Sequence, residues 1–141
     1  MKVMVVKTLK ELLEHDSRLE AIRSELEANI GDEQLEYALI LESRGSLQKP
    51  PSANGILPSV AILTARELIL VETKPNKEDA RGYIPIINRM LIADIVGTTQ
   101  EAGRFKVLLG GGGNVVFDVD QPSALLPFIG TLSGLIRNVS S

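Results

Sequence analysis

Short apolar segments separated by turns fill the chain after residue 34, and this pattern constrains the fold more than any other feature. In residues 35–42 (LEYALILE), large apolar side chains alternate with a second set that includes glutamates at both ends. The first set is Leu35, Tyr37, Leu39 and Leu41, and the second is Glu36, Ala38, Ile40 and Glu42. A period of two places successive side chains on opposite faces of a β-strand. Further short apolar runs follow at residues 59–63, 68–71, 84–87, 92–100, 104–109 and 115–119. About seven short antiparallel strands without βαβ alternation predict a sandwich or a barrel.

The connections between these runs carry turn residues. Residues 46–58 (SLQKPPSANGILP) hold three prolines and one glycine, which predicts a long loop. A four-residue turn is expected at residues 64–67, and a polar loop at residues 74–82. Pro85 places its segment at a sheet edge or in a bulge, because proline donates no ladder hydrogen bond. Gly97 indicates a bulge or a close backbone approach.

Four consecutive glycines lie in residues 108–119 (LLGGGGNVVFDV), and they allow two interpretations. A phosphate-binding loop leads from a strand into a helix and ends in Gly-Lys-Ser or Gly-Lys-Thr. Here the glycines lead into Asn114 and the strand-like segment Val115-Val116-Phe117, and no lysine follows. Glycine and asparagine accept the positive φ of tight turns, so this run predicts a β-hairpin.

A helix is expected before the strands. Thr8-Leu9-Lys10-Glu11 has the pattern of a capping box, in which Thr8 accepts the backbone N–H of Glu11. The same pattern recurs at residues 17–20, so a break or restart is expected near Asp16. Gly31 stands where a glycine would end the helix. This segment, residues 1–30, is interpreted as a helical extension before a globular unit of residues 31–141.

One face of this helix is apolar, with three-, four- and seven-residue spacing. Its candidate interaction stripe consists of Leu12, Leu19, Ile22 and Leu26. The run at residues 68–71 is apolar on both faces, so Ile69 and Val71 need a cover if the other face enters the core. We therefore expect the stripe to pack either on the barrel or on a second copy of the chain.

The last element is predicted to be an amphipathic helix. Asp120 is a suitable N-cap and Pro122 is tolerated in a first turn. Pro127 is accommodated near the start of the helix, or shifts that start. The apolar positions recur at three- and four-residue spacing: Leu125, Ile129, Leu132, Ile136 and Val139. Gly130 and Gly134 form a GxxxG spacing, interpreted as a smooth surface for close approach to a sheet.

Composition excludes several classes of protein. The chain has 141 residues, 44% hydrophobic and 23% charged, which is typical of one folded domain. Its net charge of −3 argues against a nucleic-acid module. The absence of cysteine excludes disulfides, thiolate metal sites and cysteine nucleophiles. The single histidine, His15, lies between charged neighbours and suggests neither a metal centre nor a catalytic triad.

No catalytic, metal-binding or cofactor-binding residues are predicted. Asp118 and Asp120 share a strand face by spacing, but Asp120 is better used as a helix cap. Arg66 and Glu67 are interpreted as a surface pair in a turn. The apolar runs are too short to span a bilayer, and MKVMVV is too short for a signal peptide. The cytoplasm is therefore the expected location.

Several motifs resemble the bacterial pleckstrin-homology-like (PH-like) domain family. SVAILTARELILV (residues 59–71) is similar to that family's strand, Leu-Thr-x-Arg-x-Leu and second strand. Gly31-Asp32-Glu33-Gln34 resembles its acidic lead-in. Residues 84–95 resemble its Ile-Pro-x-x-x-Ile segment, drawn out by several residues. Residues 104–119 resemble its last hairpin, and the tail its closing helix. The resemblance covers about residues 31–138.

The resemblance implies a seven-stranded antiparallel barrel, closed by a C-terminal helix and used for binding rather than catalysis. Headgroup-binding members carry a basic cluster beside the loop between strands one and two. Here Arg44 and Lys49 occupy that region, but the following strand, residues 60–63, has no basic residue. The cluster is therefore half present.

Three functions remain open at this stage. The leading hypothesis is a non-enzymatic module that binds a protein partner or self-associates. The alternative is a peripheral membrane module that binds anionic lipid headgroups through a basic patch. The candidate patch comprises Arg44, Lys49, Lys74, Lys77 and Arg81. Arg104 and Lys106 share one strand face and could combine with Lys74, Lys77 and Arg81 in a basic patch. A solvated strand face is the favoured interpretation, because Glu78 and Asp79 interrupt the charges of the loop. The third hypothesis, a small-ligand barrel or an enzyme, requires a polar pocket that no motif indicates.

Overall fold

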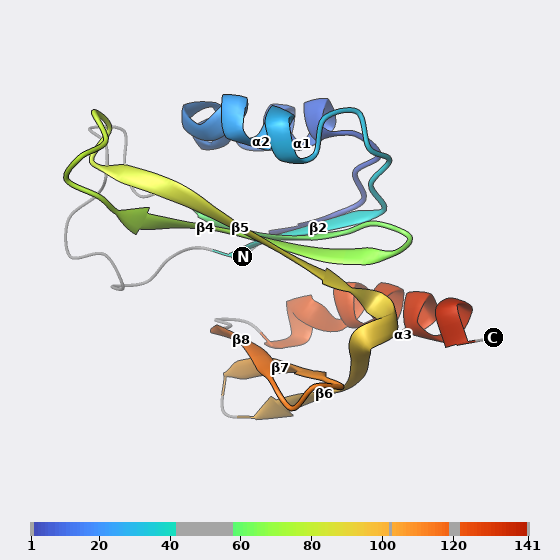
Figure 1. The fold of residues 1–141 in the computed structure, drawn as a ribbon. Coiled ribbons are helices and arrows are strands. Elements are labelled where there is room, and N and C mark those ends of the chain that lie inside the picture. Colours follow the sequence, from blue (N-terminus) through green and yellow to red (C-terminus); the bar gives the residue numbers. More distant parts are fainter. Residues whose placement is uncertain (1, 42–57, 102, 119–121, 141) are drawn as a thin grey trace.

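The computed structural model describes residues 2–41, 58–101, 103–118 and 122–140. Within these ranges the chain forms three layers (Figure 1). A layer of short helices covers one face of a five-stranded antiparallel sheet. The other face packs on a three-stranded antiparallel sheet and the C-terminal helix. The expected mainly-β fold with flanking helices is confirmed at this level.

The N-terminal segment contains one strand and three helical pieces. They are the strand β1 (Lys2–Met4), the helix α1 (Leu9–His15), the 3₁₀ helix η1 (Ser17–Ile22) and the helix α2 (Arg23–Asn29). No pattern in the sequence predicts the strand β1, because three residues are too few to show a period. It lies beside β2 in the five-stranded sheet, so residues 1–30 contribute a strand as well as helices.

The predicted cap at Thr8 is present, whereas the second predicted cap lies one residue earlier than the sequence pattern places it. The Thr8 side chain accepts the N–H of Glu11 at 3.2 Å, and the Glu11 carboxylate accepts the N–H of Lys7 at 3.1 Å. The predicted break lies at Asp16, whose side chain accepts the N–H of Arg18 at 3.1 Å. Asp16 rather than Ser17 is therefore the second cap. Gly31 ends this layer at φ +60°, in the left-handed region that glycine tolerates.

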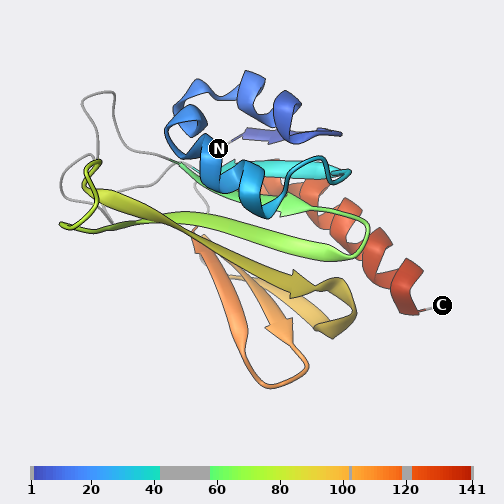
Figure 2. The same cartoon turned by 45° about the horizontal axis from the view of Figure 1, so that its top comes forward.

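The five-stranded sheet has the order β1-β2-β3-β4-β5, and all neighbouring strands are antiparallel. Its remaining strands are β2 (Tyr37–Leu41), β3 (Ser59–Leu63), β4 (Glu67–Pro75) and β5 (Tyr83–Leu91). β4 and β5 form a long hairpin that extends past β3 (Figure 2). β5 is an edge strand, which accommodates Pro85 as the sequence predicted.

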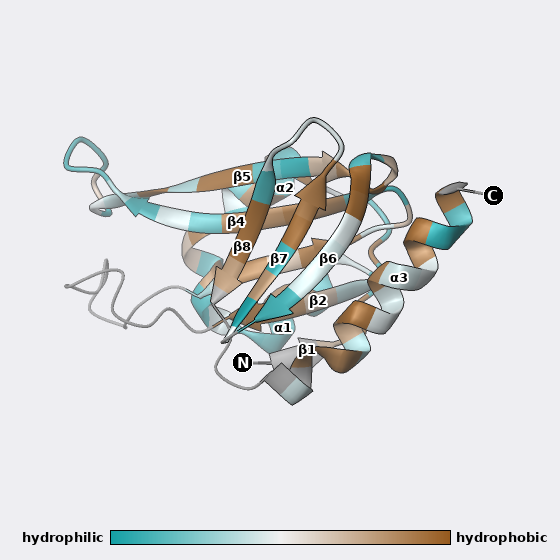
Figure 3. Ribbon diagram, turned by 90° about the horizontal axis from the view of Figure 1, so that it is seen from below, coloured by the Kyte–Doolittle hydropathy of each residue, from teal (hydrophilic) through white to brown (hydrophobic). Residues whose placement is uncertain are grey.

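The three-stranded sheet has the order β6-β7-β8, with β6 (Ile95–Glu101), β7 (Arg104–Leu109) and β8 (Asn114–Asp118). A 3₁₀ turn, η2 (Ile92–Asp94), occupies the start of the strand predicted over residues 92–100. The predicted bulge is present, because the β6–β7 register shifts between Ile95 and Gly97. Seen from below, these strands cross β4 and β5 at a steep angle (Figure 3).

The glycine run forms the hairpin between β7 and β8, as predicted. Gly112 has φ +94°, and its N–H donates to the Leu109 carbonyl at 3.0 Å. The Leu109 N–H donates to the Gly113 carbonyl at 2.9 Å. A strand rather than a helix follows the glycines, so this run has no helix N-terminus beside it to hold an anion.

The C-terminal segment comprises η3 (Pro122–Leu125) and α3 (Leu126–Ser140). Pro127 is the second residue of α3, so the helix starts later than Pro122 alone would suggest. The helix contacts β2 and η2, and it lies beside β6 in the lower layer (Figure 3). The predicted N-cap Asp120 lies outside the described residues. No helix in the described ranges is both long and apolar enough to cross a membrane.

The five-stranded sheet is buried on both faces along residues 38–41, 60–63 and 68–71. Toward the helical layer it presents Ala38, Ile40, Val60, Ile62, Ile69 and Val71. Toward the lower layer it presents Leu39, Leu41, Ala61, Leu63, Leu68 and Leu70. The lower core is completed by a group of aromatic residues, in which the ring of Phe105 stacks on Phe117 and meets Phe128 edge-on.

The expected closed seven-stranded barrel is not seen among the described strands. No ladder joins β5 to β6 or β8 to the first sheet, and the strands form two sheets instead. The physical reason lies in strands β2 to β4, which are apolar on both faces. A barrel interior would cover only one of these faces, whereas a layered arrangement covers both.

The buried position of Leu19 provides a test of this layering. Leu19 is fully buried, whereas Leu126 is 62% exposed. We expect Leu19→Ala to lower the free energy of unfolding by about 2–5 kcal/mol, because it leaves a cavity in the core. The control Leu126→Ala should change it by less than about 0.5 kcal/mol. Urea denaturation of both variants measures this, and a Leu19→Ala variant as stable as the parent would contradict the layering.

The interpretation of Gly130 and Gly134 as a surface for close approach to a sheet is wrong. Apart from its chain neighbours and the backbone of its own helix, a Cβ at either residue would meet no atom of the described chain within 4 Å. The two glycines therefore lie on the outer side of α3, where nothing in the described chain requires their small size. Packing of α3 relies instead on the opposite side, which carries Phe128 and Leu132.

Gly130 lies within helix α3 and faces open space. Gly130→Ala should therefore stabilise the protein by about 0.5–1 kcal/mol, because alanine has a higher helix propensity than glycine. Gly112→Ala is the matched control. It should destabilise by roughly 1–2 kcal/mol, because its φ is in the left-handed region. Thermal unfolding gives both shifts. A loss of stability in Gly130→Ala would show that another surface packs closely on this part of the helix.

Candidate functional site

The outer face of the three-stranded sheet gathers polar side chains. Along β7, Phe105 and Val107 are buried against the five-stranded sheet, so Arg104 and Lys106 point outward. The ladders place Thr99 and Val116 on either side of Lys106, and Glu101 beside Arg104. The alternation of residues along this strand predicts that Arg104 and Lys106 share one face, and the structure confirms it.

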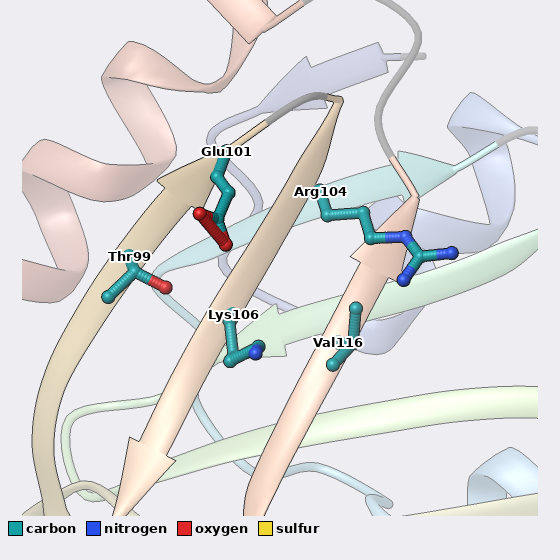
Figure 4. A pocket seen from close by; sticks show the side chains of 5 residues that line it. All are labelled: Thr99, Glu101, Arg104, Lys106 and Val116. Atoms are coloured by element: carbon teal, nitrogen blue, oxygen red, sulfur yellow. The ribbon is translucent and has the colours of Figure 1, made fainter.

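These five side chains line a shallow hollow of about 520 Å³ (Figure 4). They come from three adjacent strands, and both signs of charge are present. Lys106 and Glu101 make no ion pair within the part of the chain that the structure describes. The hollow is therefore lined by two basic side chains, one carboxylate, one hydroxyl group and one apolar side chain. Such a surface suits a partner that carries complementary charges.

Two arginines, Arg81 and Arg89, connect the helical layer to the β4–β5 hairpin through ion pairs and hydrogen bonds. Arg81 makes ion pairs with Glu25 of α2 at 2.6 Å and with Asp79 at 2.9 Å. It also donates to the Ala21 carbonyl at 2.9 Å, and its guanidinium lies 5.3 Å from the centroid of the Tyr83 ring. Hydrogen bonds from Arg81 lower the pKa of Asp79 from 3.8 to about 2 and also lower that of Glu25.

Arg89 makes the second attachment. Its guanidinium pairs with Glu33 at 2.6 Å and with Glu67 at 2.8 Å, and it donates to the Asn29 carbonyl. The hydrogen bond from Arg89 lowers the pKa of Glu67. The sequence had paired Glu67 with Arg66, whereas the structure pairs it with Arg89. These attachments were missed because several partners lie 22 to 60 residues away, beyond the reach of local patterns.

The candidate basic patch does not gather at one place within the described chain. Arg44 and Lys49 lie outside the described residues. Lys74 and Lys77 are exposed on the β4–β5 hairpin and have no acidic partner among the described residues. Arg81 is already engaged by Glu25 and Asp79. Two of the five residues are therefore seen with their charge available to a ligand.

The candidate interaction stripe belongs to the hydrophobic core. Leu12, Leu19, Ile22 and Leu26 are each 0–1% exposed. They pack in one cluster with residues of the five-stranded sheet such as Ile69 and Val71. Of the two positions expected for the stripe, the structure shows the one on the chain's own sheet, and these side chains offer no surface to a second copy.

The remaining sequence candidates take structural or peripheral positions. Asp118 ends β8, while its proposed companion Asp120 lies outside the described residues. Thr64 is buried and accepts the N–H groups of Arg66 and Glu67, which holds the β3–β4 turn. His15 is exposed at the end of α1.

The described residues contain no cluster of three or more histidine, cysteine, aspartate or glutamate side chains placed to hold a metal ion. Comparison of the chain with protein-family models, curated proteins and solved structures found no match. The function must therefore be argued from the surfaces of the molecule itself.

The attachment through Arg81 predicts an acid-dependent contribution to stability. The Asp79 pKa is lowered in the folded state, so this contribution is present above about pH 4 and is lost as the pH falls toward 2. Arg81→Met should therefore flatten the stability curve over that range, because both carboxyl groups lose the side-chain hydrogen bonds from Arg81 that lower their pKa values most. The backbone N–H of residue 81 still donates to Asp79 in this variant, so part of the lowering of the Asp79 pKa remains. Urea denaturation as a function of pH measures the curve.

Lys77→Met is the matched control for this experiment. Lys77 is an exposed cation of the same hairpin without a carboxylate partner in the described chain. Its removal should leave the acid limb of the curve unchanged. Parallel curves for the parent and Arg81→Met would show that the Arg81 ion pairs do not depress these pKa values.

Proposed function

We propose that the chain is a non-enzymatic PH-like module that binds a protein partner through the outer face of sheet β6-β7-β8. The order of the elements supports the PH-like part. Four consecutive antiparallel strands, β2 to β5, precede three more, β6 to β8, and a C-terminal helix follows. This is the sequence of elements that the resemblance implies, arranged here as two open sheets with one additional N-terminal strand.

The observation that carries the binding function is the hollow on the outer sheet face. It brings Lys106, Glu101 and Arg104 together on a surface that the helical layer and α3 leave open (Figure 4). Charges of both signs on an open surface favour recognition of a complementary protein surface, because they select register and orientation. Val116 is 43% exposed and adds an apolar contact.

The lipid alternative has less support. A headgroup site needs several convergent cations that form charge-assisted hydrogen bonds. In the described chain, Arg81 is engaged by two carboxylates, which leaves Lys74 and Lys77. Glu72 and Glu78 lie close to these lysines in the sequence and reduce the local positive charge.

Charge reversal at Lys106 tests the proposed surface. Lys106→Glu should abolish capture of at least one partner from the native host, measured by quantitative mass spectrometry of proteins retained by the immobilised chain. The control Lys77→Glu makes the same change on the β4–β5 hairpin and should retain that partner. Light scattering of the purified chain identifies the case in which the partner is a second copy. Identical capture profiles for the parent and Lys106→Glu would contradict the proposal.

Vesicles separate the two candidate functions. Sedimentation with phosphatidylserine-containing vesicles at low salt should leave the protein in the supernatant. Binding that is lost in the double variant Lys74→Glu/Lys77→Glu and at high salt would instead favour the lipid function, because such binding is electrostatic.

A further inference from the structure

A second hollow, of about 410 Å³, lies where the two sheets separate. Its apolar part is formed by Leu70 and Met90 of the five-stranded sheet and by Leu109 and Val115 of the three-stranded sheet. Leu70 is 6% exposed, and the other three are half-buried. We call this hollow the inter-sheet groove. Its volume falls within the range of about 300–1,000 Å³ that is typical of ligand sites.

The inter-sheet groove runs along the edges of two strands. Successive side chains of a strand point to opposite faces, so consecutive residues can line one groove only where the strand turns its edge toward it. Residues 88–90 of β5 and residues 114–116 of β8 do so. β5 is the last strand of its sheet, and β8 is the last strand of the other. Each has a ladder partner on one side only within the described chain.

The rim of the groove carries polar groups that have no partner in the described chain. Glu72 of β4 and Asn88 of β5 are exposed, and their side chains make neither an ion pair nor a hydrogen bond with the described residues. Lys74, two positions after Glu72 on the same strand, is not among the groove residues. Arg89 also lines the groove, but its guanidinium pairs with Glu33 and Glu67. Glu72 is therefore a carboxylate beside the apolar floor that has no cationic partner among the described residues.

We infer that the inter-sheet groove binds an extended segment of the partner protein, an inference that rests on the proposed function. The segment has apolar side chains at alternate positions and a lysine or arginine that pairs with Glu72. A strand edge supplies main-chain hydrogen bonds to such a segment, and the apolar floor selects its alternate side chains. Glu72 selects the cation by charge complementarity. The same arrangement disfavours an acidic segment, which would face Glu72 without a compensating cation.

The probe is the acetylated and amidated peptide Lys-Thr-Val-Thr-Val-Thr-Lys. Its valines and lysines share one face when it is extended, and a lysine occupies each end, so that either strand direction is allowed. The matched peptide replaces both lysines with glutamates. Titration of the isotope-labelled full chain, followed by amide NMR, should give saturable shifts at millimolar lysine peptide. These shifts should centre on residues 88–90 and 114–116, and the glutamate peptide should give none.

Two variants identify the charge contact. Glu72→Gln should weaken binding of the lysine peptide about two- to fivefold at low salt, as expected for an exposed ion pair. Glu78→Gln makes the same change in the exposed loop of the same hairpin, outside the groove, and should bind like the parent. Both residues are exposed, so neither change should impair folding.

Three results would overturn the inference: no binding of the lysine peptide, equal binding of the glutamate peptide, or shifts centred on the outer sheet face around Lys106. A host partner whose capture depends on Lys106 would leave the proposed function standing in each of these cases. Conversely, peptide binding in the groove without any partner dependent on Lys106 would support the inference and contradict the outer face as the binding surface.

Discussion

Burial of both faces of strands β2 to β4 is the constraint on which the rest of the structure depends. Val60 and Ile62 of β3 face the helices, while Ala61 and Leu63 face the lower layer. Each large side chain removed from water contributes about 1.5–3 kcal/mol, so neither face can remain exposed without a large loss of stability. The chain supplies both covers itself, from segments before and after these strands.

The two covers determine which surfaces remain for binding. The apolar stripe of the helical layer packs on the sheet, and Arg81 and Arg89 attach the layer to the β4–β5 hairpin. These ion pairs are partly exposed, so each contributes little to the free energy of unfolding. We therefore attribute to them the position of the helical layer on the hairpin, and attribute its stability to the apolar core. In the lower layer, the inner face of sheet β6-β7-β8 is buried, whereas its outer face and the groove beside β8 remain open.

Local patterns predicted the elements better than their assembly. Residues 59–63 and 104–109 are strands with the expected bounds, and Gly31 and Gly112 have the expected positive φ. The break at Asp16 was also predicted. These features depend on neighbouring residues. The division into two sheets, the Arg89 ion pairs and the inter-sheet groove depend on contacts between distant segments, which periodicity and turn residues do not encode. The outer face was found in part, because the alternation along β7 places Arg104 and Lys106 together.

Native-state amide hydrogen exchange tests the central claim most directly. If β3 and β4 lie between two layers, their amides at residues 60–63 and 68–71 exchange only when the whole chain unfolds, with the free energy measured by urea denaturation. The ends of α3 and the β4–β5 hairpin loop exchange by local opening, with lower free energies. Fast exchange of β3 amides under conditions in which the helices remain protected would contradict the layered core.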